Sequence, residues 1–306
     1  MIATAEHLVN LDLAELQRLS LPLLDQKRLE VDILRLDRIH PIISGNKWFK
    51  LKYNLQYAIA QEKDSIITIG GAYSNHILAT AAACKELGLK SIGLVKGDSP
   101  KELSCTLKSA EALGMKIEFK PRNFFHHSKD LLAYLNKEYA DSYFVEEGGR
   151  NDKGVLGATE ILRLIHVQEY KYICCSIGTG TTMAGIVNAS LNNQKVLGFS
   201  SLKISERENE LSNFLAQKTN PNKNYEIIYD YHFGGYARRN AQLIQFMNDL
   251  YSRTSISTDF VYTGKLLYGV LDLSQLNKFE PGTGILIIHS GGLQGNCSLP
   301  TGTLLF

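Results

Sequence analysis

Residues 172–182 read YICCSIGTGTT, and this stretch decides the fold. It begins with an apolar run of strand length, Tyr172–Cys175, continues through a glycine-rich loop at Ser176–Thr182, and leads into a stretch with helical periodicity. An apolar strand that passes through a glycine loop into a helix is typical of parallel sheets with helices on both faces. The stretch therefore predicts one strand–helix unit of an α/β protein.

The same alternation continues on both sides of this unit, almost from end to end of the chain. Further apolar runs of strand length lie at Val31–Leu36, Ser65–Ile69, Ser91–Val95, Met115–Phe119, Tyr143–Val145, Val196–Phe199, Tyr225–Tyr229 and Ile285–Ile288. Helical stretches separate them, and Gly88 follows one of these where a left-handed C-cap is expected. The predicted fold class is α/β, with two open, twisted parallel-sheet domains and a cleft between them.

The charge balance and the lack of long apolar runs argue against several classes of protein. The 306 residues hold 33 Lys and Arg against 31 Asp and Glu, a net charge of +2, so we expect no nucleic-acid partner. No apolar run approaches the roughly 18 residues of a transmembrane helix, so we expect no membrane partner. The opening stretch Met1–Ser20 lacks the apolar segment of a secretion signal. We therefore expect a soluble cytoplasmic protein.

The cysteines and histidines form no recognisable disulfide or metal-binding pattern. Five cysteines are an odd number, and none forms a CxxC pair, which fits a reducing compartment and argues against a disulfide framework or a zinc site. His126 and His127 have no acidic or cysteine partner nearby in the sequence. Cys174 and Cys175 are expected to pack as small apolar residues in a strand. We expect no bound metal.

Glycine-rich segments follow several of the predicted strands. In open parallel sheets, ligands bind beyond the carboxyl ends of the strands, where loops meet helix N-termini. The candidate binding segments are Gly70–His76, Glu147–Asn151, Ser176–Thr182 and His289–Gly292, together with Ser44–Lys47 at the start of a long predicted helix.

The Ser176–Thr182 loop is suited to a single phosphate. Its glycines let a ligand approach the backbone, and its amides, its hydroxyls and the following helix favour an anion. The dinucleotide pattern GxGxxG fails because Met183 stands at the third glycine. The P-loop pattern fails because Leu266 stands where Ser or Thr is required after the only Gly-Lys pair. The alternative is a tight turn that binds nothing.

Ser74 and His76 are close in sequence but do not form a serine-hydrolase motif. A nucleophile elbow needs glycine two residues on either side of the serine, and Ala72 and His76 occupy those positions. Ser74 and Asn75 are instead polar groups at the start of a predicted helix, where N-capping is the alternative to a binding role.

Lys47 lies at the start of a predicted helix, beside Trp48 and Phe49. A lysine that is partly desolvated near a helix N-terminus has its ammonium form disfavoured, which suits an amine that forms a Schiff base. The alternative is a solvated surface lysine, and this is what we expect for Lys50 and Lys52.

Parts of four of these segments and a fifth motif, at residues 262–265, occur together in one order along the chain. They are Ser44-Gly45-Asn46-Lys47 with Lys50-Leu51, Tyr73-Ser74-Asn75-His76, Gly178-Thr179-Gly180-Thr181, Tyr262-Thr263-Gly264-Lys265 and His289-Ser290-Gly291-Gly292. This arrangement resembles the pyridoxal-phosphate (PLP) enzymes of fold type II, and within them the D-cysteine desulfhydrase and 1-aminocyclopropane-1-carboxylate (ACC) deaminase family. The similarity runs from about Leu34 to Gly292.

The resemblance implies catalytic roles for three residues. Lys47 would form a Schiff base with PLP and would take the Cα proton of the substrate once released. Ser74 would bind the substrate carboxylate or act as an acid–base group beside Lys47, and Tyr262 would stand near the leaving group. The substrate implied is a small amino acid.

The resemblance also implies the contacts to the cofactor. Asn75 would hydrogen-bond the 3′-oxygen of PLP, and Ser290 would face its pyridine nitrogen. A hydroxyl there cannot keep the ring protonated as a carboxylate would, so the electron sink is moderate and suits elimination over transamination. The phosphate would be held by Gly178, Thr179, Gly180 and Thr181.

The family fold implies a smaller domain, residues 51–150, inserted into a larger PLP-binding domain formed by residues 1–50 and 151–306. PLP would lie in the cleft between them, and the resemblance also implies a homodimer. Composition marks no boundary, because the chain has no Pro-rich linker, low-complexity segment or internal repeat.

Several positions depart from the ACC deaminase pattern. Thr263 and Ser290 stand where ACC deaminases typically carry Glu and Leu, and Ile287 stands where they tend to carry Tyr. Thr263 and Ser290 are closer to the desulfhydrase pattern. The function we expect is therefore α,β-elimination of D-cysteine to pyruvate, sulfide and ammonia.

Other activities stay open at this point. Trp48-Phe49, Tyr73 and Arg150 depart from both subgroups and are expected to surround the substrate, so they leave its identity open. ACC deaminase activity, which gives α-ketobutyrate and ammonia, is the first alternative, and β-replacement or racemase activity is the second. A PLP- or nucleotide-binding protein without turnover is the third.

Overall fold

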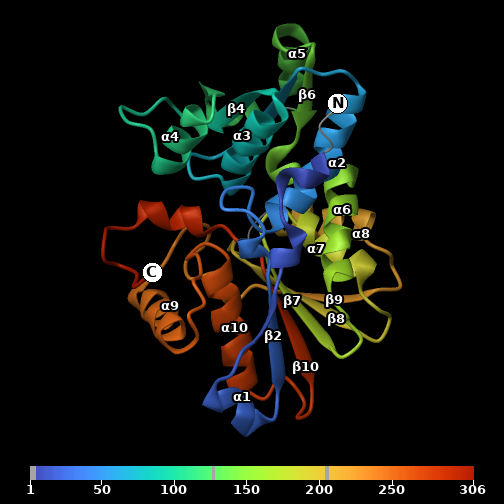
Figure 1. The fold of residues 1–306 in the computed structure, drawn as a ribbon, viewed down its shortest axis with the longest axis vertical. Helices are drawn as coiled ribbons and strands as arrows, with labels where there is room; N and C mark the ends of the chain where they lie inside the picture. The colour runs from blue at the N-terminus through green and yellow to red at the C-terminus, as the bar shows by residue number, and fades with distance from the viewer. Residues whose placement is uncertain (1–4, 126–127, 204–206) are drawn as a thin grey trace.

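Two sheets organise the structure, a computed structural model that describes residues 5–125, 128–203 and 207–306 (Figure 1). The larger sheet has six strands in the order β1-β2-β10-β7-β8-β9. Its strands are β1 (Leu16–Arg18), β2 (Glu30–Arg35), β7 (Tyr172–Ile177), β8 (Lys195–Ser200), β9 (Asn224–Ile228) and β10 (Gly284–His289). β1 pairs antiparallel with β2, and the other neighbours pair in parallel.

The smaller sheet has four strands in the order β5-β4-β3-β6, and all its neighbours pair in parallel. Its strands are β3 (Ser65–Gly70), β4 (Lys90–Lys96), β5 (Met115–Lys120) and β6 (Ser142–Val145). All four come from the part of the chain between β2 and β7, so the smaller sheet is inserted into the larger one. The predicted α/β class with two parallel-sheet domains is confirmed, whereas the apolar pattern does not reveal the antiparallel β1. The boundary at residues 51–150 stays a prediction.

Helices connect the strands and cover both faces of the larger sheet. They are α1 (Pro22–Lys27), α2 (Asn46–Ala60), α3 (Asn75–Leu87), α4 (Cys105–Ala112), α5 (Ser128–Glu138), α6 (Asp152–Thr159), α7 (Thr181–Ala189), α8 (Arg207–Lys218), α9 (Ala241–Thr254) and α10 (Thr263–Gln275). Figure 1 shows α6 and α7 on one side of the larger sheet and α9 and α10 on the other. Gly88 ends α3 in the predicted left-handed conformation, with φ +70°.

The two faces of the larger sheet carry separate hydrophobic cores. In β7, Ile173 and Cys175 pack in the core formed with α6 and α7, whereas Cys174 packs in the core formed with α10. This alternation follows from the two-residue period of a strand. Cys174 and Cys175 are therefore buried as small apolar side chains, as predicted.

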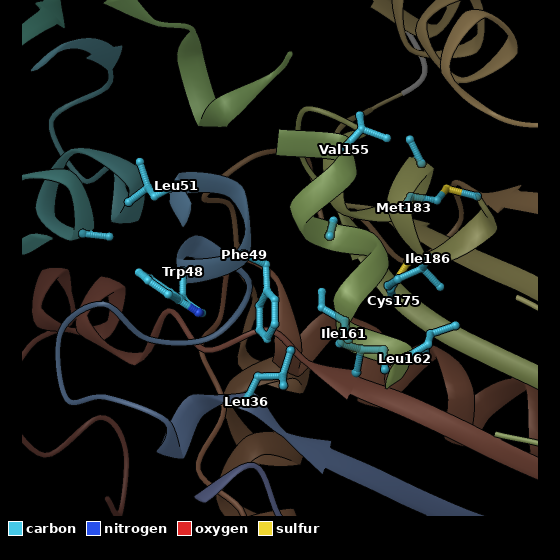
Figure 2. Close-up of a cluster of buried hydrophobic side chains, with 14 of the residues drawn as sticks. Leu36, Trp48, Phe49, Leu51, Val155, Ile161, Leu162, Cys175, Met183 and Ile186 are labelled. Carbon is cyan, nitrogen blue, oxygen red and sulfur yellow. The ribbon is translucent and has the colours of Figure 1, made fainter. Parts of the chain in front are cut away.

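Trp48 and Phe49 belong to the core that anchors the start of α2 (Figure 2). Both side chains are buried, together with Leu51, in a cluster that includes residues of α6 and α7. A Cβ at Gly157 would lie 1.8 Å from the carbonyl oxygen of Phe49, so the backbones of α2 and α6 approach more closely than any larger residue at position 157 would allow. This packing fixes the helix whose first turn carries Lys47.

A disulfide bond joins Cys105, in α4, to Cys297, in the 3-10 helix Leu293–Ser298. The expectation that the cysteines form no disulfide is therefore wrong. The sequence gives no signal for this pair, because the two cysteines are 192 residues apart. The bond ties a helix beside the smaller sheet to the segment that follows β10. The remaining cysteines are free and buried: Cys84, Cys174 and Cys175.

Within the described residues, no helix is both long and apolar enough to cross a membrane. Over the same ranges, no group of three or more His, Cys, Asp or Glu side chains is arranged to hold a metal ion. His126 and His127, the adjacent pair for which the sequence offers no acidic or cysteine partner nearby, lie outside the described residues.

Candidate active site

A cavity of about 620 Å³ lies where the carboxyl ends of strands from both sheets converge. Segments that follow β3, β6, β7 and β10 line it, and the N-terminus of α2 completes the wall. Thr181 does not line it and is fully buried at the start of α7. The other predicted site residues all line it: Lys47, Ser74, Asn75, Gly178, Thr179, Gly180, Tyr262 and Ser290.

Lys47 extends from the first turn of α2 into the cavity. Its Nζ donates a hydrogen bond of 2.6 Å to Oδ1 of Asn46, whose Nδ2 donates in turn to Oγ1 of Thr182 at 2.7 Å. Burial lowers the pKa of the Lys47 amine to about 8, against an opposing effect of Asp259. The side chain therefore supplies a positioned amine that is more readily neutral than an exposed lysine.

The start of α2 is fixed against the end of β10. Gly45 has φ +66°, and a Cβ there would lie 1.9 Å from the carbonyl oxygen of Ser290. The backbone N–H of Asn46 donates to that same oxygen at 3.3 Å. Glycine is required at position 45 both for its conformation and for this close approach. The contact brings Lys47 and Ser290 to one cavity.

A second lysine, Lys50, lines the cavity one helical turn after Lys47. Its side chain is buried, and burial together with the charge of Lys47 holds the pKa of Lys50 well below its ordinary value. The expectation of a solvated lysine is wrong here, and also for Lys52, which forms a largely buried ion pair with Glu160 at 2.9 Å. The signal that identifies Lys50 is its three-residue spacing from Lys47, which places both on one helix face.

The loop before α7 forms a cradle for an anion. Gly180 has φ +88°, a left-handed conformation that favours glycine, and the N-terminus of α7 follows directly. The hydroxyl oxygens of Thr179 and Thr181 lie 3.1 Å apart. The free N–H groups at the first turn of a helix attract negative charge. The loop can therefore hold a phosphate, as the sequence suggested.

Two adjacent glycines connect this loop to Lys50. A Cβ at Gly148 would lie 2.8 Å from Cγ2 of Thr179, and a Cβ at Gly149 would lie 3.1 Å from Cβ of Lys50. Larger residues at either position would push the loop and α2 apart. The glycines thus let the backbone of α2 at Lys50 and the loop at Thr179 pack closely against the same segment.

Ser74 begins α3 at the edge of the cavity. Its Oγ accepts a hydrogen bond from the N–H of Ile77 at 3.3 Å, so Ser74 is the N-cap of the helix. The N-capping alternative is therefore confirmed for Ser74, and the same residue also lines the cavity.

Asn75 and His76 present buried polar atoms to the same cavity. Among the described residues, Oδ1 of Asn75 and both ring nitrogens of His76 have no hydrogen-bond partner. Burial and the charges of Lys50 and Lys47 hold the pKa of His76 well below its ordinary value, so the ring is neutral. Buried polar atoms without partners are costly, which indicates a wall built to meet a polar ligand.

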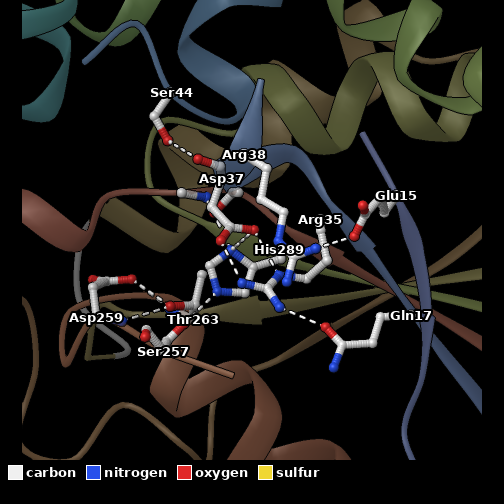
Figure 3. A network of polar contacts seen from close by, with 12 residues as sticks. Glu15, Gln17, Arg35, Asp37, Arg38, Ser44, Ser257, Asp259, Thr263 and His289 are labelled. Carbon is white, nitrogen blue, oxygen red and sulfur yellow. Dashed lines mark hydrogen bonds and ion pairs between the residues drawn. The ribbon is translucent and has the colours of Figure 1, made fainter. Parts of the chain in front are cut away.

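A buried ionic network holds the residue that precedes Ser290 (Figure 3). The Asp37 carboxylate accepts hydrogen bonds from Arg35 at 2.8 and 2.6 Å and lies 3.0 Å from Nδ1 of His289. Nε2 of His289 faces the carbonyl oxygen of Ser257 at 2.8 Å. Burial would raise the pKa of Asp37, but the hydrogen bonds from Arg35 and His289 outweigh it and hold that pKa well below its ordinary value.

Ser290 and Ser176 lie side by side at the ends of β10 and β7. Their Oγ atoms are 3.2 Å apart, and both residues line the cavity. Because a hydroxyl can donate and accept at once, Ser290 can bond to Ser176 and still offer a hydrogen bond to a ligand.

Tyr262 closes another side of the cavity and is held through its backbone. Oδ2 of Asp259 accepts hydrogen bonds from the N–H groups of Val261 and Tyr262 at 2.9 and 2.8 Å. Oδ1 of Asp259 accepts from the N–H and the hydroxyl of Thr263 at 2.8 and 2.7 Å. The centre of the Tyr262 ring lies 6.0 Å from Nζ of Lys47.

Tyr236 is a cavity residue that the sequence did not reveal. It lies in the segment between β9 and α9, and its ring centre is 6.1 Å from that of Tyr262. Burial and the neighbouring Tyr236 raise the pKa of Tyr262 well above its ordinary value, so the Tyr262 hydroxyl stays protonated at neutral pH. The segment has no apolar periodicity, so nothing in the sequence points to Tyr236.

Lys265 holds the segment that carries Tyr236. Its side chain is buried, and its Nζ donates hydrogen bonds to the carbonyl oxygens of His232 and Gly235, both at 2.8 Å. Burial lowers the pKa of Lys265 to about 8. The last residue of the Tyr262–Lys265 motif is therefore a tether for a neighbouring wall of the cavity.

Among the residues that depart from both subgroups, Tyr73 lines the cavity, whereas Trp48, Phe49 and Arg150 do not. Trp48 is buried in the core beside α2. The guanidinium of Arg150 stacks on Phe214 at 4.6 Å and donates to the carbonyl oxygen of Glu210 at 3.0 Å. The expectation that Trp48, Phe49 and Arg150 surround the substrate is wrong, because packing occupies all three side chains.

Known proteins resemble this chain in sequence and in fold. A family model described as pyridoxal-phosphate dependent enzyme matches residues 10–291. A Pyrococcus horikoshii protein with a provisional ACC deaminase name is 30% identical over 269 residues, which cover 83% of this chain and 81% of that protein. The mitochondrial bifunctional D-cysteine desulfhydrase/ACC deaminase of Arabidopsis thaliana is 29% identical, over 83% of this chain and 70% of its own. The crystal structure of an ACC deaminase homologue superposes with a TM-score of 0.78 at 26% identity, over 97% of both chains.

The cavity fits PLP on its own chemistry. The loop before α7 can receive a phosphate, and Lys47 supplies a buried amine with a lowered pKa. The buried Asn75 lines the same cavity with an amide that can bond to a polar ring substituent. PLP is therefore the cofactor, and the chain belongs to the pyridoxal-phosphate-dependent enzymes, within the family of the ACC deaminases and D-cysteine desulfhydrases.

Proposed function

We propose that this PLP-dependent enzyme is a lyase that converts D-cysteine to pyruvate, sulfide and ammonia. The observation that carries this choice over ACC ring opening is the position of Thr263. This residue stands where ACC deaminases typically carry a glutamate, and it is fully buried with its hydroxyl bonded to Asp259. Position 263 therefore offers no carboxylate that could act on a distal carbon of the substrate. Elimination of a thiol needs only a base at Cα and a good leaving group.

The cofactor contacts we propose follow the cavity walls. Gly178, Thr179 and Gly180 of the wall would hold the phosphate, together with Thr181 behind them, whose hydroxyl oxygen lies 3.1 Å from that of Thr179. Asn75 would bond to the 3′-oxygen, and Ser290 would face the pyridine nitrogen. When bound, PLP supplies an electron-accepting ring that stabilises negative charge at the substrate's Cα.

Lys47 is the residue we propose as the base at Cα. Its pKa of about 8 leaves about one amine in ten neutral at pH 7, far more than for an exposed lysine. Asn46 accepts a hydrogen bond from the Nζ of Lys47, and this contact orients the amine. A general base works best when its pKa lies near the operating pH.

In this proposal, Ser74 lies at the carboxylate end of the substrate and Tyr262 lies at its sulfur end. Ser74 lies at the N-terminus of α3, where free N–H groups and the helix dipole favour the substrate carboxylate. Tyr262 stays protonated because its pKa is raised, so its hydroxyl can give a proton to the departing sulfur.

The experiment that tests this function is an assay of keto acid and sulfide release. The PLP-loaded protein is incubated with D-cysteine, L-cysteine and ACC, and pyruvate, α-ketobutyrate and sulfide are quantified. We expect equal amounts of pyruvate and sulfide from D-cysteine and little product from ACC. α-Ketobutyrate from ACC without pyruvate from D-cysteine would establish the second candidate, ACC deaminase activity, which the names of several relatives favour.

We also propose a homodimer, a cytoplasmic location and an inserted domain at residues 51–150. Sedimentation of the purified protein tests the first, and fractionation of the source cells tests the second. Native-state hydrogen exchange tests the third, because the amides of β3, β4, β5 and β6 should then open together as one unit, separately from those of the larger sheet.

A further inference from the structure

A second chamber of about 220 Å³ opens beside the main cavity. The two share a wall formed by Tyr73, Asn75, Tyr236, Ala237 and Tyr262. The far wall of the chamber is formed by Arg239, Phe260, Val261, Gly295 and Ser298. Because Tyr262 is the residue placed near the leaving group, the chamber lies on the side of the cavity toward which a substrate side chain would extend. A side chain as short as that of cysteine leaves this space unfilled.

Arg239 gives the chamber its charge. Among the described residues that line it, Arg239 is the one charged side chain, and none is acidic. Its guanidinium lies 5.2 Å from the centre of the Phe260 ring, a stacking contact that limits the freedom of the side chain. A planar guanidinium held against an aromatic ring is well suited to bind a carboxylate with two parallel hydrogen bonds.

The walls of the chamber are held in place on both sides. Lys265 tethers the segment that leads to Arg239 through two carbonyl oxygens, and within that segment Ala237 adopts φ +53°. A non-glycine residue in this conformation stores strain that surrounding contacts must sustain, a feature common at ligand sites. On the other side, the disulfide between Cys105 and Cys297 anchors the 3-10 helix that contributes Gly295 and Ser298.

We propose that Arg239 is a specificity-determining residue that binds a carboxylate at the far end of the substrate side chain. The preferred substrates are then S-substituted cysteines whose sulfur carries a short chain ending in a carboxylate. This inference rests on the proposed elimination and names the substrate class of that same site. Aromatic rings of Tyr73 and Tyr236 would flank the methylene groups that connect the sulfur to the carboxylate.

The reaction balances without a further reactant except water. The Cα–H bond breaks and its proton goes to Lys47. The Cβ–S bond breaks next, and the electron pair leaves with sulfur, which takes a proton and departs as a carboxylated thiol. The three-carbon remainder takes up one water and leaves as pyruvate and ammonium. Nothing is oxidised or reduced by an outside agent.

The test compares two substrates that differ only in charge. S-(2-carboxyethyl)-D-cysteine and its amide, S-(2-carbamoylethyl)-D-cysteine, are assayed for pyruvate release by the PLP-loaded protein. We expect kcat/KM to favour the acid by at least about tenfold, as a charged hydrogen-bonded pair requires. In Arg239→Gln, the ratio falls to about one through a higher KM for the acid, whereas Arg239→Lys keeps part of the preference.

Arg238→Gln is the matched control, because Arg238 is exposed and lines neither chamber. It is expected to keep the wild-type ratio. Equal kcat/KM for acid and amide in the wild type overturns the inference, and so does an equal loss in Arg238→Gln and Arg239→Gln. Both results leave elimination from D-cysteine intact.

Failure of the proposed function gives a different pattern. If no pyruvate forms from D-cysteine or from either analogue, elimination is excluded. Calorimetric titration of the carboxyethyl compound into PLP-loaded wild type and Arg239→Gln then tests the carboxylate site by binding, independently of elimination. An affinity at least about tenfold lower in Arg239→Gln supports the carboxylate site, and equal affinities overturn it.

Discussion

Nζ of Lys47 donates a hydrogen bond to Oδ1 of Asn46 at 2.6 Å, so two consecutive residues of α2 orient the amine of the cavity. Asn46 is itself fixed, because its Nδ2 donates to Oγ1 of Thr182 in α7. The amine is therefore connected by side chains to the helix whose N-terminus forms the anion cradle. These two hydrogen bonds therefore fix the amine of Lys47 relative to the loop where a phosphate would bind.

Asn46→Ala removes the oxygen that orients Lys47. We expect kcat to fall about 10- to 100-fold, because a misplaced base loses the alignment that proton transfer needs. PLP content should stay near the wild-type level. The control is Asn192→Ala, an exposed asparagine far from the cavity, which should leave kcat unchanged. An Asn46→Ala protein with wild-type kcat would refute the orienting role.

The lowered pKa of Lys47 predicts its chemical reactivity. Burial disfavours the ammonium form, so the neutral, reactive amine accumulates at lower pH than for an exposed lysine. In PLP-free protein, the rate of acylation at Lys47 should rise with pH and level off above about 8. Peptide mass spectrometry after timed labelling gives this profile, with Lys85 on the same protein as the exposed comparison. A Lys47 profile that still rises at pH 10 would contradict the buried setting.

Lys265→Met removes the tether of the Tyr236 segment while keeping a side chain of similar length. Two charge-assisted hydrogen bonds are lost and two carbonyls are left without their donor, so we expect a stability loss of about 1–3 kcal/mol. KM for the substrate should rise, because Tyr236 is no longer held against the cavity. Lys278→Met, which removes an exposed ion pair with Glu226, should cost about 0–1 kcal/mol. Denaturant unfolding and steady-state kinetics measure both effects.

The disulfide determines how many free thiols the unreduced protein should contain. Unfolded without reductant, the chain should expose the thiols of Cys84, Cys174 and Cys175, and two more should appear only after reduction. Cys297→Ser should lower the free energy of unfolding by about 2–4 kcal/mol, since a long loop is no longer closed. Reductant should lower the stability of the wild type but not of this variant. Five thiols in the unreduced protein would exclude the bond.

Much of the fold follows from local patterns in the sequence. The apolar run at Tyr172–Cys175 and the left-handed Gly88 are read correctly because strand period and helix caps depend on near neighbours. The antiparallel β1 is too short to produce a pattern. The Cys105–Cys297 disulfide depends on tertiary contact across 192 residues, which no local rule reaches.

The cavity is less completely predictable. Motif residues such as Lys47 and Ser290 converge because parallel strands end at one edge of a sheet. Burial of Lys50 depends on how α2 packs against the glycines that follow β6, and Tyr236 depends on an irregular segment. Arg150 was expected near the substrate, but its stacking on Phe214 is a tertiary contact that the sequence does not encode locally.

The central claim is that Lys47 carries PLP in this cavity. The most direct measurement is borohydride reduction of the PLP-loaded protein, followed by digestion and mass spectrometry, which fixes the cofactor to its lysine. We expect the pyridoxyl mass on the peptide that contains Lys47, and Lys47→Ala should lose both this label and the visible absorbance band. A label on Lys50 instead, or a wild-type protein that stays colourless after PLP is added, would contradict the account.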